Sequence, residues 1–136
     1  MAKTLVKVKL LGGKRLRKRL AKMDPQQNAR ILIKSYREIA LKISANARNV
    51  QIRRGRGAVH PTKLTHRSFR LRDSIVPDFK GLPRFAEVGT NLFYGAIHEF
   101  GLGRFPARPF MEPALDAISP TIPVIVTKHW KREAGL

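Results

Sequence analysis

The chain has 136 residues, of which 43% are hydrophobic, and a formal net charge of +19. This length predicts one domain that buries about two-thirds of its unfolded surface, and the absence of cysteine excludes disulfides, thiolate metal sites and cysteine nucleophiles. No apolar run approaches the roughly 18 residues of a transmembrane span, so we expect a soluble protein without a membrane partner.

The positive charge is concentrated in the first half of the chain. Up to Arg72 there are 21 Lys and Arg against two acids, a net charge of +19, and from Asp73 onward there are seven of each, a net charge of zero. Such asymmetry indicates a polyanionic partner, most often nucleic acid and less often an acidic protein or membrane surface. The alternative is a hydrated face that only keeps the protein in solution.

The N-terminal region predicts a strand followed by a basic helix. Residues 4–11 alternate apolar and basic side chains, the period-two pattern of a strand with one wet face. Residues 14–23 have the spacing of a short helix on which like charges lie one turn apart, so a bound polyanion would relieve their repulsion. The candidate contacts for nucleic acid or a partner here are Lys14, Arg15, Arg17, Lys18 and Arg19.

Asp24 and Pro25 predict the start of a long helix that runs to about Asn49. One apolar stripe recurs at spacings of three and four, and consists of Ala29, Ile33, Tyr36, Ala40, Ile43 and Ala47. Four further apolar residues widen it, namely Ile31, Leu32, Ile39 and Leu41. The surplus favours either a deeply packed helix or a face shared with a neighbouring subunit.

Residues 50–65 are rich in glycine and arginine and have no periodicity, which predicts a flexible basic loop of about 15 residues. Arg53, Arg54 and Arg56 could follow a phosphate backbone without reading sequence. The same loop could equally become ordered only against a protein neighbour. No aromatic residue lies between these arginines, so stacking on single-stranded bases is not supported.

The remaining elements complete an α+β fold. A helical turn near Leu71 leads into a strand at residues 75–79, and a turn at 80–83 joins it to a strand at Phe85–Thr90, a hairpin that the N-terminal strand could extend. Asn91 is expected to cap a short helix that ends at Gly101 and Gly103. A proline-rich loop follows, and then a helix from Phe110, with Pro113 in its first turn.

Pro120 and Pro123 predict a kink or break in the C-terminal helix near Ser119, which could cap the second piece. The tail after the break is too apolar to extend freely into water, so it should pack on the domain or on another chain. The expected architecture is therefore a small antiparallel sheet against a long helix in the N-terminal half, with a short helix, a proline-rich loop and a kinked C-terminal helix.

No catalytic or cofactor motif is found. His98-Glu99 resembles the opening of a metalloprotease helix, but Leu102 stands where the second histidine belongs. Four scattered acids could in principle form a nuclease-like metal site, namely Asp73, Asp78, Glu87 and Glu99. We therefore expect no enzyme, no bound metal and no cofactor, with a metal-dependent nuclease as an alternative.

Residues 88–101 (VGTNLFYGAIHEFG) and 106–117 (PARPFMEPALDA) together resemble a family of tailed-bacteriophage neck proteins, the tail-completion or head–tail joining proteins. A weaker match is RSFRLRDSI at residues 67–75. Phe69 and Gly95 stand where that family usually has glycine and alanine. The candidate motif and subunit-interface residues are Gly89, Tyr94, His98, Glu99, Phe100, Gly101, Ala107, Arg108, Pro109 and Phe110.

The resemblance implies a structural virion protein that forms a ring, expected to be hexameric, around the channel through which double-stranded DNA passes. Its neighbours would be connector or head-closure proteins and tail-tube or tail-terminator proteins. Its location would be the virion neck or tail, and the host cytoplasm during assembly. A nucleic-acid-binding module without sequence specificity is the alternative.

Within the motif, Arg108 is expected either to form a fixed salt bridge, with Glu99 or with an acid of the next subunit, or to be an ordinary surface arginine. Phe100, Phe105 and Phe110 are expected in the core rather than at an interface, because phenylalanine is usually buried. His98 is expected to be a hydrogen-bonded polar residue on a helix surface.

Overall fold

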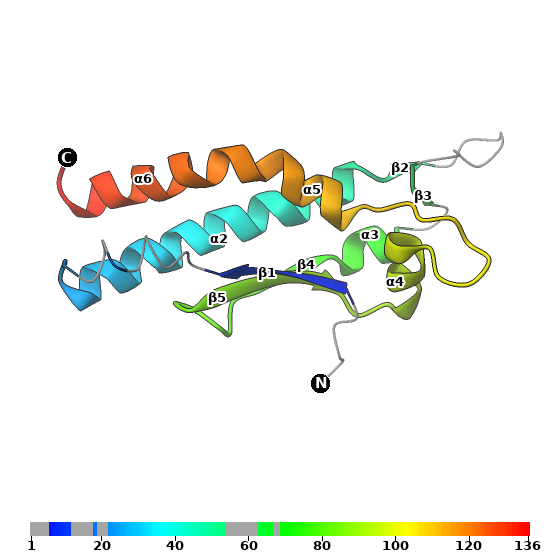
Figure 1. Cartoon of the computed structure of the whole chain (residues 1–136), viewed down its shortest axis with the longest axis horizontal. Coiled ribbons are helices and arrows are strands. Elements are labelled where there is room, and N and C mark those ends of the chain that lie inside the picture. The colour runs from blue at the N-terminus through cyan, green and yellow to red at the C-terminus, as the bar shows by residue number, and fades with distance from the viewer. Residues whose placement is uncertain (1–5, 12–17, 19–21, 54–62, 67–68) are drawn as a thin grey trace.

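A computed structural model describes residues 6–11, 18, 22–53, 63–66 and 69–136. In this part of the chain α2 lies between the sheet on one side and α5 and α6 on the other (Figure 1). The elements are β1 (Val6–Leu11), α2 (Pro25–Asn49), β2 (Ile52–Arg53), β3 (Thr65–His66), α3 (Arg70–Ser74), β4 (Val76–Asp78), β5 (Phe85–Thr90), α4 (Phe93–Phe100), α5 (Met111–Ile118), the 3₁₀ helix η1 (Ser119–Thr121) and α6 (Ile122–Glu133). The predicted α+β class is confirmed.

Helix α2 begins and ends where the sequence predicts. The Asp24 carboxylate accepts a hydrogen bond from the Gln27 amide at 3.3 Å, and Pro25 occupies the first helical position. The helix is about 37 Å long at 1.5 Å per residue. It packs on the sheet and on two helices at once, which explains its wide buried face, formed by Ile31, Ser35, Tyr36, Ile39, Ala40, Ile43, Ser44 and Ala47.

The predicted apolar stripe of α2 is only partly right. Ala29 and Ile33 are only half-buried, whereas Ile31 between them is fully buried, so the buried side of the helix is turned away from the predicted stripe here. Ile31 and Ile39 belong to the core, whereas Leu41 is 54% exposed. Leu41 therefore lies on the outer side of α2, between bases that are described below.

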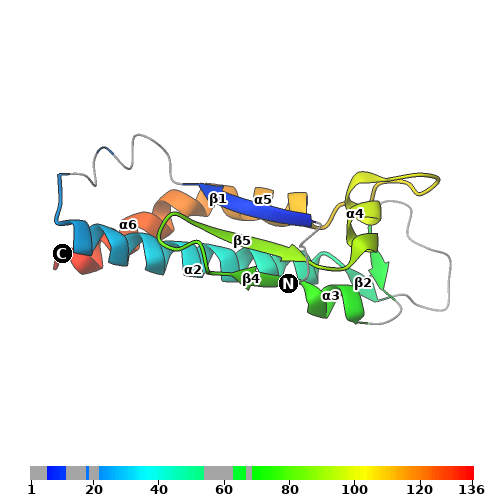
Figure 2. The same ribbon diagram turned by 90° about the horizontal axis from the view of Figure 1, so that it is seen from below.

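The three-stranded antiparallel sheet has the order β1-β5-β4, so the predicted hairpin forms and the N-terminal strand extends the sheet on the β5 side. Central strand β5 pairs with β1 from Val6↔Thr90 to Leu11↔Phe85, and with β4 from Val76↔Gly89 to Asp78↔Glu87. The view from below shows all three strands lying along α2 (Figure 2). Ala86, Val88 and Thr90 alternate along β5 and are fully or almost fully buried.

The predicted basic loop at residues 50–65 has paired ends. Gln51 is buried, and Ile52 and Arg53 pair in parallel with Thr65 and His66, a short ladder that no periodicity in the sequence indicated. Residues 54–62, which include Arg54 and Arg56, lie outside the described residues. So does most of the predicted helix at residues 14–23, although the described Lys22 and Met23 form a turn rather than a helical end.

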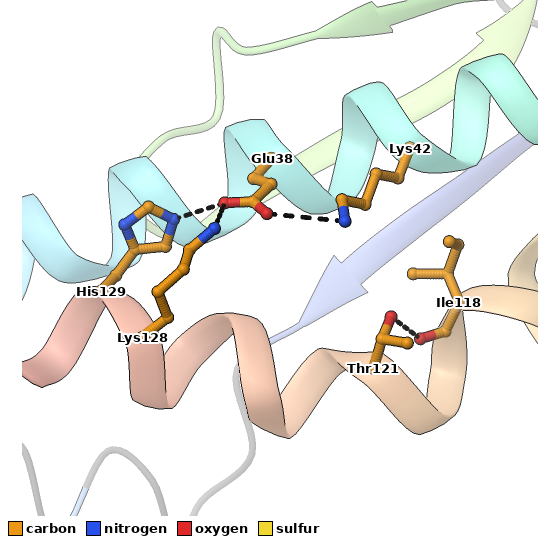
Figure 3. Close-up of polar contacts among 6 residues, drawn as sticks. All are labelled: Glu38, Lys42, Ile118, Thr121, Lys128 and His129. Atoms are coloured by element: carbon orange, nitrogen blue, oxygen red, sulfur yellow. Dashed lines mark hydrogen bonds and ion pairs between the residues drawn. The ribbon is translucent and has the colours of Figure 1, made fainter.

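The predicted break near Ser119 is confirmed, because α5 ends at Ile118 and η1 separates it from α6. The predicted cap is wrong. The Ser119 hydroxyl donates back to the Leu115 carbonyl at 3.0 Å, and the Thr121 hydroxyl donates to the Ile118 carbonyl at 2.7 Å (Figure 3). Both side chains thus bond to the preceding turn, and neither caps α6.

Candidate functional site

Motif residues of α4 and of the loop that follows it form a hydrogen-bonded unit around Glu99. This side chain is 8% exposed. Its Oε2 accepts hydrogen bonds from the amides of Phe110 (2.8 Å) and Met111 (3.0 Å), and its Oε1 accepts one from Glu112 at 3.0 Å. These are among the amides at the start of α5 that have no partner within the helix. A carboxylate from α4 therefore caps α5, where the positive end of the helix dipole also favours negative charge.

Gly101 reverses the chain after α4. Its φ of 66° is left-handed, and an added Cβ would lie 2.6 Å from the Ala107 nitrogen, so both the conformation and the space require glycine. The Arg108 amide then donates to the His98 carbonyl at 2.7 Å, which returns the loop to α4. Phe110 follows at 0% exposure. The motif is thus the frame that joins α4 to α5.

The expected salt bridge between Arg108 and Glu99 is not formed; the Glu99 carboxylate instead accepts hydrogen bonds from three backbone amides. Arg108 is half-buried, its Nε is buried without a hydrogen-bond partner, and it forms no ion pair with a described acid. His98 is half-buried against the Tyr94 ring, with the two ring centroids 6.3 Å apart. Burial lowers the pKa of His98, and the nearby Arg108 cation lowers it further.

The expectation that Phe100 and Phe105 lie in the core is wrong. The inner side of α4 is taken by Gly95 and Glu99, so Phe100 points outward and is 63% exposed. The loop from 102 to 107 is exposed throughout. We use the term aromatic end for the exposed apolar side chains of α4 and this loop, which are Phe93, Phe100, Leu102 and Phe105.

Two departures from expectation occur at the start of α4. Leu92, not Asn91, precedes the helix, and the Leu92 amide donates to the Thr90 hydroxyl at 3.1 Å. Gly95, where the phage family usually has alanine, packs so closely that an added Cβ would lie 2.8 Å from the Thr90 methyl. Thr90 also shares a hydrogen bond of 2.6 Å with Ser74, which fixes its side chain.

A second surface forms where α6 packs beside α2, and its bases are not the ones that the sequence singled out. Of the eight predicted basic contacts, only Lys18, which is exposed, and Arg53, which lies in β2, are described residues. The structure instead brings together seven exposed bases from both halves of the chain. This α2–α6 basic face consists of Arg30, Lys34, Arg37 and Lys42 on α2 and Lys128, Lys131 and Arg132 on α6.

Glu38 joins the two helices beneath this face. Its Oε2 accepts a hydrogen bond from Lys128 Nζ at 2.5 Å and lies 2.8 Å from His129 Nε2, and its Oε1 lies 3.7 Å from Lys42 Nζ (Figure 3). The hydrogen bond from Lys128, with further help from His129, lowers the pKa of Glu38 to about 2. Lys34 and Glu133 form a second ion pair between the helices, so α6 is antiparallel to α2.

Glu38→Gln is expected to lower the free energy of unfolding at pH 7 by about 1 to 2 kcal/mol, since the side chain is 24% exposed and solvent screens its pairs. The folded-state pKa of Glu38, about 2, lies below the usual 4.5. The stabilisation that ionised Glu38 gives to the folded state is therefore complete above about pH 4.5 and disappears as the pH falls toward 2. The free energies of unfolding of the wild type and of Glu38→Gln, measured in urea across this pH range, should converge at low pH. Asp116→Asn, at an exposed position of α5, is the control.

The described residues contain no group of three His, Cys, Asp or Glu that could hold a metal ion. Of the four acids considered for a nuclease site, Asp78 and Glu87 are partners across the β4–β5 pair, whereas Glu99 caps α5. None of the helices in the described part is long and apolar enough to span a bilayer.

Comparison with known proteins gives little further information. No protein-family model matches the chain, and no solved structure matches it. It is 44% identical over 55 residues to the uncharacterized protein MJ0331 of Methanocaldococcus jannaschii. That similarity covers 39% of this chain and 39% of the archaeal protein, so the chain spans well under half of its relative.

Proposed function

We propose that this protein is a structural subunit of the tailed-phage neck, which assembles with copies of itself into a ring at the head–tail junction around the DNA channel. The proposal combines the motif resemblance with one structural observation that carries it. The motif residues build a hydrogen-bonded frame, and this frame presents the aromatic end to solvent.

Large apolar side chains that gather on a surface mark sites of protein association. Phe93 and Phe100 are seven residues apart on α4, so they share one face of the helix, and the loop carrying Leu102 and Phe105 continues from its end. A patch of this kind that docks on a different surface of an identical copy makes a head-to-tail contact, which closes into a ring when the rotation allows it.

The test is the mass of the assembled protein. The wild-type chain, alone and mixed with connector or tail particles, is expected to form rings by light scattering and negative-stain microscopy. F100S/F105S should shift the protein to monomers, because it removes two anchors of the aromatic end. L41S/V124S, which removes two exposed apolar side chains from α2 and α6, should still assemble. A wild-type chain that stays monomeric and joins no particle would contradict the proposal.

A binding module for nucleic acid that acts without a ring is the second candidate, and the α2–α6 basic face favours it. A monomer that binds duplex DNA tightly and does not associate with phage particles would support this alternative.

A further inference from the structure

We propose that the α2–α6 basic face binds the phosphate backbone of duplex DNA without reading its sequence. This inference deepens the proposed function and rests on it for the choice of DNA as the partner. It differs from the sequence-based prediction, which placed the contacts at residues 14–19 and 53–56.

The first support is the charge that remains after the internal ion pairs. Seven bases share the face with two acids, Glu38 and Glu133, which leaves a net charge of +5. Both acids are already engaged by Lys34, Lys42 and Lys128. The other four bases form no ion pair with a described acid. Arg37 lies over the Phe79 ring, 5.5 Å from its centroid, and the Arg30 cation is close enough to Glu133 to lower its pKa. Arg30, Lys131 and Arg132 can therefore turn toward an external anion without breaking an ion pair.

The second support is the geometry of the two helices. Arg30 and Lys42 are about 18 Å apart along α2 at 1.5 Å per residue, a span that matches about five base-pair steps of duplex DNA at 3.4 Å each. The bases of α6 form a second row on an antiparallel neighbour, joined to the first through Glu38. Packed helices hold such rows in place, so binding phosphates requires little ordering of the backbone.

The third support is that the described residues of this face offer no uncovered aromatic ring on which bases could stack. The exposed side of α2 carries Arg30, Lys34, Arg37, Leu41 and Ala45, none of them aromatic. The ring nearest to it, of half-buried Phe79, has the Arg37 cation over it, 5.5 Å from the ring centroid. Trp130 is two residues from Lys128 and so points to the other flank of α6, where its Nε1 donates to Met23 Sδ at 3.1 Å. Lysine and arginine on a helix surface position a phosphate backbone but carry no sequence information. Single-strand binding would instead need stacking platforms.

The experiment compares two full-length variants that lose the same charge. R30Q/K131Q/R132Q removes the three bases of the face that have neither an ion pair nor a ring contact with a described residue. K80Q/R84Q/R104Q removes three exposed bases from the β4–β5 turn and the α4–α5 loop. Affinity for a labelled 30-base-pair duplex is measured by fluorescence anisotropy between 50 and 200 mM salt. We expect the face variant to lose at least tenfold in affinity, and its slope of log K against log[salt] to decrease by about 2 to 3, whereas the control loses less than threefold.

Equal losses in the two variants would overturn the proposal, because they would reflect net charge alone. It would also fail if only R53Q/R54Q/R56Q lost affinity, or if polyglutamate competed as well as the duplex, which would indicate an acidic protein partner. Ring formation by the same variants separates this inference from the proposed function. If the face variant forms intact rings but has lost its affinity for DNA, both the DNA site and the ring are supported. If the wild-type protein is monomeric and its DNA affinity still depends on the face, the DNA site is retained and the proposed ring is rejected.

Discussion

Phe110→Ala is expected to lower the free energy of unfolding by about 3 to 5 kcal/mol, the range found when a buried aromatic side chain is truncated. Phe110 is fully buried and belongs to the main hydrophobic cluster, together with Ala114 at the start of α5 and Leu71 of α3. The lower free energy of unfolding has two causes: the contacts of the phenyl ring are lost, and the surrounding backbone cannot move in to fill the cavity that remains. Chemical denaturation with urea measures it directly.

The matched control is Phe105→Ala, which truncates the same type of side chain within the exposed 102–107 loop, where Phe105 is 59% exposed. Its effect on stability should stay within about 0.5 kcal/mol, as for other surface substitutions. Phe105→Ala should weaken ring assembly directly, because Phe105 belongs to the aromatic end and Phe110 does not. Similar destabilisation by both would show that the loop packs on the domain.

Glu99→Ala is expected to lower the free energy of unfolding by about 3 kcal/mol. It leaves three amides at the start of α5 without their acceptor, two of them on buried residues, and an unsatisfied buried group costs about 1 to 3 kcal/mol. Water can reach the third amide, on exposed Glu112, so the three losses do not add in full.

Glu99→Gln tests whether charge or shape matters at this cap. The amide oxygen can still accept hydrogen bonds, but it lacks the negative charge that the helix dipole favours, so a smaller loss of about 1 to 2 kcal/mol is expected. Asp116→Asn, which removes a carboxylate charge at an exposed position outside the first turn of α5, is the control. If Glu99→Ala were as stable as this control, the carboxylate would have no structural role.

Much of the fold could be predicted from the sequence because its signals are local. Asp24-Pro25 fixes the start of α2, the alternation in residues 85–90 gives β5, and Pro120 marks the break before α6. The errors involve partners distant in the sequence. Asn91 is a good capping residue by type, but the Thr90 hydroxyl already accepts the Leu92 amide. The β2–β3 ladder depends on two pairs of residues that no pattern connects.

The candidate surfaces were harder to predict than the fold. Charge made Glu99 one candidate partner of Arg108, beside an acid of the next subunit or no partner at all. In the structure Glu99 binds three backbone amides, and amide partners cannot be inferred from residue types. The α2–α6 basic face could not be predicted from charge counted along the chain, because the bases and acids of the C-terminal half balance to a net charge of zero. Only the packing of α6 on α2 brings Lys128, Lys131 and Arg132 to the bases of the long helix.

The loop between Gly101 and Arg108 has a consequence for how this protein can diversify. Its two ends are anchored, by the left-handed turn at Gly101 and by the bond from Arg108 to His98, while every residue between 102 and 107 faces water. Insertions and exchanges within this stretch therefore leave the interior untouched. Substitutions at residues 102–107 can therefore change which surface the protein binds without changing its fold.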